Sequence, residues 1–244
     1  MSYVICEEWS TQFRDADQDG LLGLRGYMNY FQELVGKYQL SLGIGVNRIY
    51  PRYGLVWLYS KFRARVFEKV PYGEKVEMKV WAEPLRSSVR LTPVLEIRYE
   101  GRLAFQGRLE ACLANLETGA IARISDIEMG EDAFGPALEE LPGFTRLPRQ
   151  LPQGEKAWEY RVGYSDLDIN HHMNNQRYIP LFMDAFDSAF WKEHPVRELE
   201  IHYLNQSYEG ETLTVLGQQE EKGSRLVALK EDGTPAANAW LGWE

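Results

Sequence analysis

Long apolar runs, disulfide-forming cysteines and an excess of positive charge are all missing from this sequence of 244 residues. Only Cys6 and Cys112 are present, which excludes a scaffold held together by many disulfides. Neither has a histidine nearby in the sequence, so we expect two reduced thiols and no cysteine nucleophile. No stretch approaches the roughly 18 apolar residues of a membrane-spanning helix. The first residues form neither a basic leader nor a long apolar core, and we expect a cytoplasmic protein without a membrane span.

The charge balance is acidic, with 27 Lys and Arg residues against 36 Asp and Glu residues and a net charge of −9. This balance argues against general binding of nucleic acid. The composition is otherwise that of a folded protein, with 44% hydrophobic residues and many aromatic residues, which favour strands. We therefore expect a strand-rich folded chain that binds no nucleic acid.

One segment, residues 165–179, places acidic, amide and imidazole side chains two residues apart. If this segment is extended, its side chains alternate between two sides. Asp168, Asn170, His172 and Asn174 then face one way. The side chains that face the other way are Leu167, Ile169, His171 and Met173. An orienting acid, a hydrogen-bonding amide and a proton-transfer group on one side are the components of an acid–base reaction centre.

Each of these residues also has a simpler interpretation. Asp168 alone would cap a turn or a helix, and His172 alone would be a hydrogen-bonded structural histidine. A metal site built from Asp168, His171 and His172 would lack a further ligand, so we predict no metal and no cofactor. His171 faces away in the extended arrangement and is predicted to be structural. The clustering of titratable groups favours the catalytic interpretation of Asp168, Asn170 and His172.

The sequence contains an internal duplication, because shifting it against itself aligns like residues in the same order in two halves. The aligned pairs are Asp15 with Asp166, Asp17 with Asp168, Tyr27 with Tyr178, Phe31 with Phe182 and, further on, Gly73-Glu74 with Gly210-Glu211. Where the second half has Asn170, His171 and His172, the first has Asp19, Gly20 and Leu21. Only the second half therefore keeps the predicted chemistry.

Helical spacing of apolar residues follows the Asp-x-Asp turn in each half. The first helix is predicted from Leu24, Tyr27, Met28, Phe31, Leu34 and Val35, and the second from Ile179, Phe182, Met183, Phe186 and Phe190. Pro180 suits only the first turn of a helix, so the second helix should begin near it. Turns at 99–101 and 231–233 predict hairpins. Each half is thus one helix and about five antiparallel strands, an α+β fold in which a sheet wraps around the helix.

Three segments follow from this organisation. Residues 1–130 form the first repeat, residues 131–154 a proline-rich linker, and residues 155–244 the second repeat with the catalytic motif. The prolines of the linker disfavour both helices and hydrogen-bonded strands. One short helix is nevertheless predicted at 137–141. The first repeat, which lacks the motif, is free to hold the apolar part of a substrate.

The first repeat also contains an incomplete calcium-loop pattern. Asp15, Asp17 and Asp19 fit its opening, but the twelfth place, where a Glu should close the site, is Gly26. Since Asp15 and Asp17 also align with Asp166 and Asp168, the duplication accounts for them without calcium.

The stretch Asp-Leu-Asp-Ile-Asn-His-His-Met-Asn-Asn-Gln-Arg-Tyr-Ile at 166–179 closely resembles the signature of acyl-acyl carrier protein thioesterases of plant plastids and bacteria. Weaker similarity covers nearly the whole chain. The resemblance implies a double hot-dog fold, two tandem repeats each with an antiparallel sheet wrapped around a central helix. It also implies hydrolysis of the thioester between a fatty acyl chain and the phosphopantetheine arm of an acyl carrier protein.

The resemblance assigns the site residues one by one. Asp168, Asn170 and His172 fall on the family's catalytic Asp, Asn and His. The family has a Glu followed by a Cys on the strand after the helix, and Gln206 and Ser207 occupy those positions here. Glutamine can orient a water but cannot accept its proton, so Asp168 and His172 must carry more of the chemistry.

Further expectations concern the substrate. The backbone N–H groups of residues 174–177 are predicted to bind the oxyanion. Tyr27, Met28 and Phe31 are predicted to line the acyl chain, although the same side chains would serve equally as core. The carrier in this family is acidic, and the candidate basic residues are Lys61, Arg63, Arg65, Lys69, Arg86, Arg90, Arg98 and Arg102. The sequence is compatible with a homodimer.

The sequence leaves three other functions open, two enzymatic and one non-catalytic. An acyl-coenzyme A thioesterase of the hot-dog fold would use the same motif. An enoyl-thioester hydratase of this fold would have its Asp and His one residue further apart, followed by a Pro that is missing here. The glutamine at 206 is also compatible with a non-catalytic acyl-thioester-binding protein.

Overall fold

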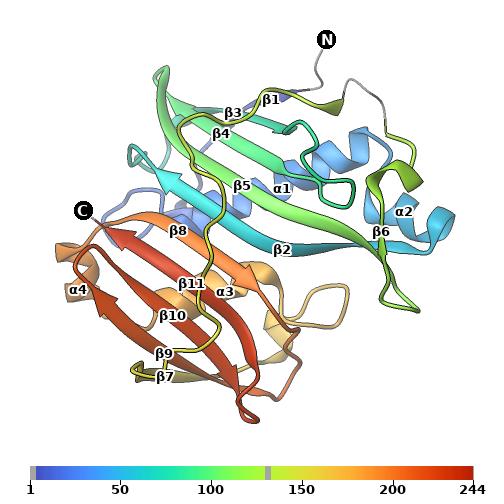
Figure 1. The fold of residues 1–244 in the computed structure, drawn as a ribbon. Coiled ribbons are helices and arrows are strands. Elements are labelled where there is room, and N and C mark those ends of the chain that lie inside the picture. The colour runs from blue at the N-terminus through green and yellow to red at the C-terminus, as the bar shows by residue number, and fades with distance from the viewer. Residues whose placement is uncertain (1–3, 130–132, 244) are drawn as a thin grey trace. The chain divides into compact units, whose positions relative to one another are not determined.

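The computed structural model describes residues 4–129 and 133–243. The chain divides into two compact units, Met1–Gly143 (unit 1) and Phe144–Glu244 (unit 2). Each unit contains an antiparallel sheet and helices, so the α+β prediction is confirmed (Figure 1). The division between the units falls inside the segment 131–154 that the prolines mark.

Unit 1 is built on a sheet in the order β1-β3-β4-β5-β2, with the short β6 paired to β5. All neighbouring strands are antiparallel. The strands are β1 (Ile5–Ser10), β2 (Leu55–Val66), β3 (Lys75–Ala82), β4 (Pro93–Tyr99), β5 (Arg102–Asn115) and β6 (Ile121–Ala122). The predicted hairpin at 99–101 joins β4 to β5, and left-handed backbone at Glu100 and Gly101 makes the turn tight.

The helix α1 (Leu24–Ser41) lies along the sheet of unit 1 (Figure 1). All six apolar residues that predicted it are buried, which confirms the helix and its buried face. Tyr27 stacks on Phe105 of β5 with ring centroids 4.6 Å apart, and Phe31 meets Phe62 of β2 edge-on. A second helix, α2 (Val46–Tyr53), follows, so the expectation of one helix in this half is wrong. The 3-10 turns of the unit are η1 (Phe13–Asp15) and η2 (Ile124–Asp126).

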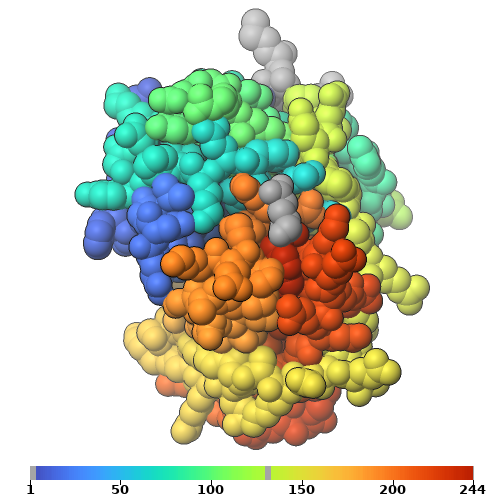
Figure 2. All heavy atoms as spheres, turned by 90° about the vertical axis from the view of Figure 1, so that its left-hand side faces the viewer, coloured from blue at the N-terminus to red at the C-terminus, as the bar shows by residue number. Residues whose placement is uncertain are grey.

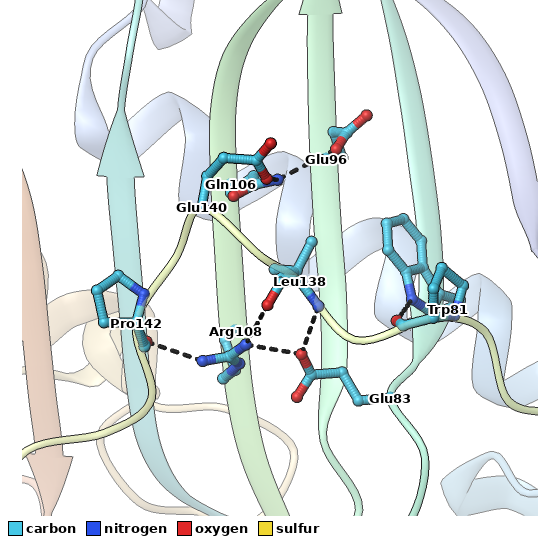
Figure 3. A network of polar contacts seen from close by, with 9 residues as sticks. Trp81, Glu83, Glu96, Gln106, Arg108, Leu138, Glu140 and Pro142 are labelled. Carbon is cyan, nitrogen blue, oxygen red and sulfur yellow. Dashed lines mark hydrogen bonds and ion pairs between the residues drawn. The ribbon is translucent and has the colours of Figure 1, made fainter.

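Residues 133–143, which we call the strap, run across unit 1 after the last strand (Figure 3). Residues 137–141 are not helical, so the helix predicted there is wrong. Two side chains, Glu83 just after β3 and Arg108 of β5, form hydrogen bonds with the backbone of the strap. These bonds take the place of those that a helix would form within its own backbone. Leu138 N donates to Glu83 at 2.8 Å, and Arg108 donates to Pro142 O at 2.8 Å. Glu83 and Arg108 also pair with each other at 2.7 Å, with both side chains 6% exposed.

Apolar packing also holds the strap against the sheet. Leu138 and Leu141 of the strap pack with Trp81 and Val94 of the sheet in one buried cluster. The indole N–H of Trp81 donates to Pro136 O at 2.7 Å. Figure 3 shows the Trp81 indole beside the strap. The strap is therefore a covering layer of unit 1 rather than a free connection.

Unit 2 repeats the architecture with a sheet in the order β8-β11-β10-β9-β7. Its strands are β7 (Glu155–Arg161), β8 (Val196–Tyr203), β9 (Thr212–Glu220), β10 (Gly223–Lys230) and β11 (Pro235–Trp243). The neighbouring strands are again antiparallel, and the predicted turn at 231–233 joins β10 to β11. The 3-10 turns η4 (Tyr164–Asp166) and η5 (Asn175–Arg177) lie between β7 and the first helix.

The single helix predicted for unit 2 is wrong, because two short helices replace it. These are α3 (Tyr178–Met183) and α4 (Ser188–Glu193). The break arises where the Asp187 side chain accepts a hydrogen bond from Phe190 N at 2.8 Å and caps α4. Phe186, Phe190, Trp191, His194 and Trp243 then form a separate aromatic cluster. Figure 2 shows the orange segment that contains α4 at the surface.

The internal duplication extends to the backbone hydrogen bonds of the two Asp-x-Asp turns, which are the same in both units. In unit 1, Asp17 N donates to Leu21 O and Gly20 N to Asp17 O. In unit 2, Asp168 N donates to His172 O and His171 N to Asp168 O. The left-handed residue of each turn is also equivalent, Gly20 at φ 74° and His171 at φ 62°. The two turns thus share one backbone and differ in their side chains.

Candidate active site

The segment that carries the predicted site is a closed turn between two short 3-10 helices. Leu167 and Met173 pair as an isolated antiparallel bridge, and residues 168–172 close the turn between them. Met173 N donates to Ser207 O at 2.8 Å, which fixes the turn to the segment after β8. The extended arrangement that we predicted is therefore wrong. Asp168 and His172 meet across a turn instead of sharing one side of a strand.

Asp168 and His172 form the core of the site. One carboxylate oxygen of Asp168 accepts from Asn170 N at 2.8 Å, so the turn-capping interpretation holds for that oxygen. The other lies 3.9 Å from His172 Nδ1. The His172 and Asp168 side chains are 17% and 20% exposed, which leaves both open to a substrate or a water.

The tautomer of His172 follows from its surroundings. Its Nδ1 lies 3.3 Å from Met173 O, a position from which an Nδ1–H donates. With the proton on Nδ1, Nε2 carries the lone pair and can accept a proton. The carboxylate of Asp168 lies on the Nδ1 side, 3.9 Å away, where a negative charge favours an imidazolium.

Asn170 and His171 occupy the tip of the turn, and both are exposed. Asn170 donates its backbone N–H to Asp168, and the residue is exposed. His171 takes the left-handed position, which is filled by glycine in unit 1. The structural role predicted for His171 agrees with this backbone position.

Gln206 and Ser207 follow β8 beside the turn. Ser207 is fully buried, and its hydroxyl accepts from Tyr178 OH at 3.0 Å. Burial raises the pKa of Tyr178 to about 12, so this phenol remains a donor. Gln206 is exposed, and its amide oxygen accepts from Tyr208 OH at 2.7 Å. Ser207 therefore serves packing, while Gln206 remains exposed.

The backbone N–H groups of residues 174–177 are mostly engaged inside unit 2. Asn174 N donates to Asp166 O, and Arg177 N donates to Asn174 O. Gln176 N donates to the Asn174 side chain at 2.9 Å. The helix start near Pro180 is confirmed, but three of the four groups predicted to bind an oxyanion already have acceptors.

Asp166 anchors the whole turn, a role that the pattern of polar residues in the sequence did not indicate. Its side chain is 2% exposed and accepts from Tyr160 OH at 2.6 Å, Gly163 N at 2.8 Å and Arg177 Nε at 2.7 Å. Burial alone would raise the pKa of Asp166, but these hydrogen bonds and the Arg177 charge outweigh it and lower the pKa. The sequence signal for a shared structural role was the alignment of Asp166 with Asp15, and the structure buries both residues.

We expect Asp166→Asn to destabilise the protein by roughly 2 kcal/mol at neutral pH, since hydrogen bonds to a charged group are lost. The folded-state pKa of Asp166 is below its usual value near 3.8. Its contribution is therefore complete above the unfolded-state pKa and is lost as the pH falls through the folded-state pKa. Urea unfolding of both proteins at a series of pH values should give a constant difference at neutral pH that shrinks below about pH 4. A difference independent of pH would contradict this role.

The equivalent acids of unit 1 have separate partners. Asp15 accepts from Asn29 at 2.9 Å, and Asp19 pairs with Lys69 at 2.6 Å. Burial, and to a smaller extent Asp19, raises the pKa of Asp17. Across residues 4–129 and 133–243, no group of three His, Cys, Asp or Glu side chains is placed to hold a metal ion.

The residues predicted to contact the acyl chain lie inside unit 1. Tyr27, Met28 and Phe31 are 0%, 3% and 1% exposed, and all belong to α1. Tyr27 OH donates to Glu68 O at 3.2 Å. These side chains face the sheet of their own unit, where they form its packed core.

The basic residues proposed from the sequence as contacts for an acidic carrier are largely paired with acids. Lys61 lies 3.1 Å from Glu110, and Arg98 lies 2.7 Å from Glu96. The remaining pairs are Lys69 with Asp19, Arg90 with Glu110, and Arg102 with Glu68 and Glu100, while Arg63 donates to Gly143 O. Their charges are partly neutralised within unit 1, which weakens them as a docking surface.

A cavity of about 360 Å³ lies elsewhere in unit 2. Its walls include Phe186, Leu226, Glu155 and Lys156. The lining residues do not include the Asp168–His172 turn, so we do not assign this cavity to the reaction.

The two cysteines are free, as predicted. Burial, and to a smaller extent Glu110, raises the pKa of Cys112, which makes a reactive thiolate there unfavourable. None of the helices formed by the described residues is long and apolar enough to cross a membrane.

A sheet curved around a helix, present twice in tandem, defines the class of double hot-dog proteins. Two solved structures share this fold with the chain. An acyl-ACP thioesterase from Bacteroides thetaiotaomicron aligns with a TM-score of 0.88 at 18% identity, covering 99% of this chain and 98% of that one. A 12:0-ACP thioesterase from Umbellularia californica aligns with a TM-score of 0.85 at 16% identity, covering 99% and 97%.

Family models identify the chain more closely. The model of the acyl-ACP thioesterase N-terminal domain matches residues 2–90, and that of the C-terminal domain matches residues 150–243. The chain belongs to the acyl-ACP thioesterase family. It is 23% identical over 236 residues to the chloroplastic dodecanoyl-[acyl-carrier-protein] hydrolase of Cinnamomum camphora, covering 88% of this chain and 61% of that protein. The chain thus spans about three fifths of the length of this relative.

Proposed function

We propose that the protein hydrolyses fatty acyl-acyl carrier protein thioesters, releasing a free fatty acid and the carrier protein. The observation that carries this proposal is the Asp168–His172 pair, held across a closed turn in a chain that belongs to the acyl-ACP thioesterase family. The names of the relatives, a dodecanoyl-[acyl-carrier-protein] hydrolase and a 12:0-ACP thioesterase, support the same substrate class.

The site supports attack by water. His172 Nε2 removes a proton from the water as its oxygen bonds to the thioester carbonyl carbon. Asp168 stabilises the resulting imidazolium from the Nδ1 side at 3.9 Å. When the carbon–sulfur bond breaks, the imidazolium returns the proton to the phosphopantetheine sulfur, and the products are a carboxylic acid and a thiol. Asn170, at the exposed tip of the turn, is proposed to hydrogen-bond the water or the carbonyl.

The substitution at position 206 limits which group acts as base. Gln206 is proposed to orient the water through its amide, because an amide cannot accept the proton. Ser207 is unsuited to nucleophilic attack, since its fully buried hydroxyl already accepts the Tyr178 hydrogen bond. General-base catalysis by His172 therefore accounts for hydrolysis with the residues present.

The first repeat, residues 1–130, is proposed to bind the acyl chain without taking part in the chemistry. Its turn carries Asp19, Gly20 and Leu21 where the second repeat carries Asn170, His171 and His172. Tyr27, Met28 and Phe31 are the candidate contacts, because they form the apolar face of α1. Binding of a chain there requires these side chains to move apart, since they are packed against the sheet.

The test is thiol release from a panel of acyl-carrier thioesters of different chain lengths, with the same acyl groups on coenzyme A for comparison. We expect faster turnover of the carrier-linked substrates. A clear preference for the coenzyme A thioesters would show that acyl-coenzyme A, and not the acyl-carrier thioester, is the substrate. Hydration of a crotonyl thioester without thiol release would identify a hydratase. Tight binding of acyl-carrier without turnover would identify a non-catalytic binding protein.

A further inference from the structure

The two repeats place equivalent aspartates differently, although the turns that hold them have the same backbone. In unit 2, Asp168 accepts from Asn170 N and faces His172. In unit 1, the carboxyl group of Asp17 lies against Gly23, and a Cβ atom added to Gly23 would overlap all three atoms of that carboxyl group. The side chain of Asp17 thus occupies space that exists because residue 23 is glycine.

The counterpart of Gly23 in unit 2 is Asn174. Both residues are the N-caps of the helical segment that follows, and both have extended backbone, with φ −91° and ψ 172° at Gly23 and φ −61° and ψ 136° at Asn174. Gly23 N donates to Asp15 O, and Asn174 N donates to the equivalent Asp166 O. A Cβ atom at 174 therefore stands where the carboxyl group of the preceding aspartate lies in unit 1.

We propose that Asn174 is a positioning residue whose Cβ excludes the Asp168 carboxylate from the space beside the helix start and so keeps it next to His172. This inference rests on the proposed function only for its kinetic consequence. In unit 1 the carboxylate lies in that space, and burial there raises the pKa of Asp17. In unit 2 the same position would separate the acid from the imidazole that it must stabilise.

The amide of Asn174 has a second task that must be separated from the first. Its oxygen accepts from Gln176 N at 2.9 Å and caps η5. Two variants distinguish the tasks. Asn174→Ala removes the cap and keeps the Cβ, whereas Asn174→Gly removes both, so the comparison between them isolates the Cβ.

We expect kcat for acyl-carrier hydrolysis to fall about 100-fold in Asn174→Gly relative to Asn174→Ala, because displacement of a catalytic group by about 1 Å has an effect of this size. KM should be similar in the two variants, since they differ only in the Cβ atom of residue 174. Replacement by Ser or Thr, which restores the Cβ and an oxygen for the cap, should recover turnover. Equal kcat values in the Gly and Ala variants would overturn the proposal.

Crystal structures of the same variants give a readout that is independent of activity. In Asn174→Gly the Asp168 carboxylate should move into the freed space, and its distance from His172 Nδ1 should exceed the present 3.9 Å. In the reciprocal variant Gly23→Ala, the Asp17 carboxylate should leave its place beside residue 23. An unmoved Asp168 in the glycine variant would refute the positioning role. If the unmodified protein released no thiol, the proposed function would fail, while these positions would still decide the role of Asn174.

Discussion

We expect His172→Ala to lower kcat for thioester hydrolysis by roughly 10²- to 10⁴-fold, the range of contributions from general acid–base catalysis. The imidazole provides both the acceptor for the proton of water and the donor for the leaving sulfur, and no other histidine belongs to the turn except His171 at its exposed tip. The contact of its ring with Met173 O is long, at 3.3 Å, so we expect its removal to leave the fold intact. Thiol-release kinetics together with circular dichroism measure both effects.

The matched series for this prediction lies within the same turn. Asp168→Asn keeps an oxygen that can accept from Asn170 N but removes the charge beside the imidazole, so kcat should fall with little change in stability. Asp168→Ala loses both functions. The control is His171→Gly, because glycine occupies the equivalent left-handed position in unit 1 and activity should be retained. Normal turnover in His172→Ala and Asp168→Asn would reject the assigned site.

We expect Arg108→Leu to destabilise the protein by about 3–5 kcal/mol, because it leaves the Glu83 carboxylate buried without its partner. The two side chains are each 6% exposed and lie 2.7 Å apart. Arg108 also holds Pro142 O, so the strap should loosen when the guanidinium is removed (Figure 3). Equilibrium urea unfolding, followed by tryptophan fluorescence, measures the loss.

Two variants control for the effect of Arg108. Arg102→Ala breaks the exposed contacts with Glu68 and Glu100 and should leave the unfolding midpoint nearly unchanged. The double variant Arg108→Leu with Glu83→Leu removes the uncompensated charge and should recover much of the stability. If the single and double variants were equally unstable, the loss would come from packing and not from the buried charge.

The internal duplication could be predicted from the sequence, whereas the geometry of the predicted site could not. The duplication identified two equivalent turns, and the aligned aspartates do occupy equivalent backbone positions. The alternation of polar residues suggested a strand, but left-handed backbone at His171 closes a turn. The alignment of His171 with Gly20 was the available signal for this conformation, which glycine adopts freely and histidine less often. The pairing of Asp168 with His172 survives because a turn of this length also brings its two ends together.

The helices, too, could be predicted from the sequence only in part. Six apolar residues at helical spacing defined α1 correctly, since one face of that long helix is buried. In unit 2 the same periodicity continued across Asp184 to Asp187, where a side-chain cap starts a new helix. Apolar spacing does not reveal such a break, so it could not show that Phe186 and Phe190, which are only half-buried, belong to a separate aromatic cluster. The path of the strap depended on distant side chains, Glu83 and Arg108, and could not be inferred locally.

Because the strap is bound to the sheet, the backbone amide of Leu138 can report when the strap detaches. Leu138 lies in a segment without helix or strand, yet its N–H is bound by the buried carboxylate of Glu83 at 2.8 Å. Amide hydrogen exchange at this position therefore requires the strap to detach from the sheet. Its exchange rate measures the free energy of that detachment, separately from the unfolding of unit 1 as a whole.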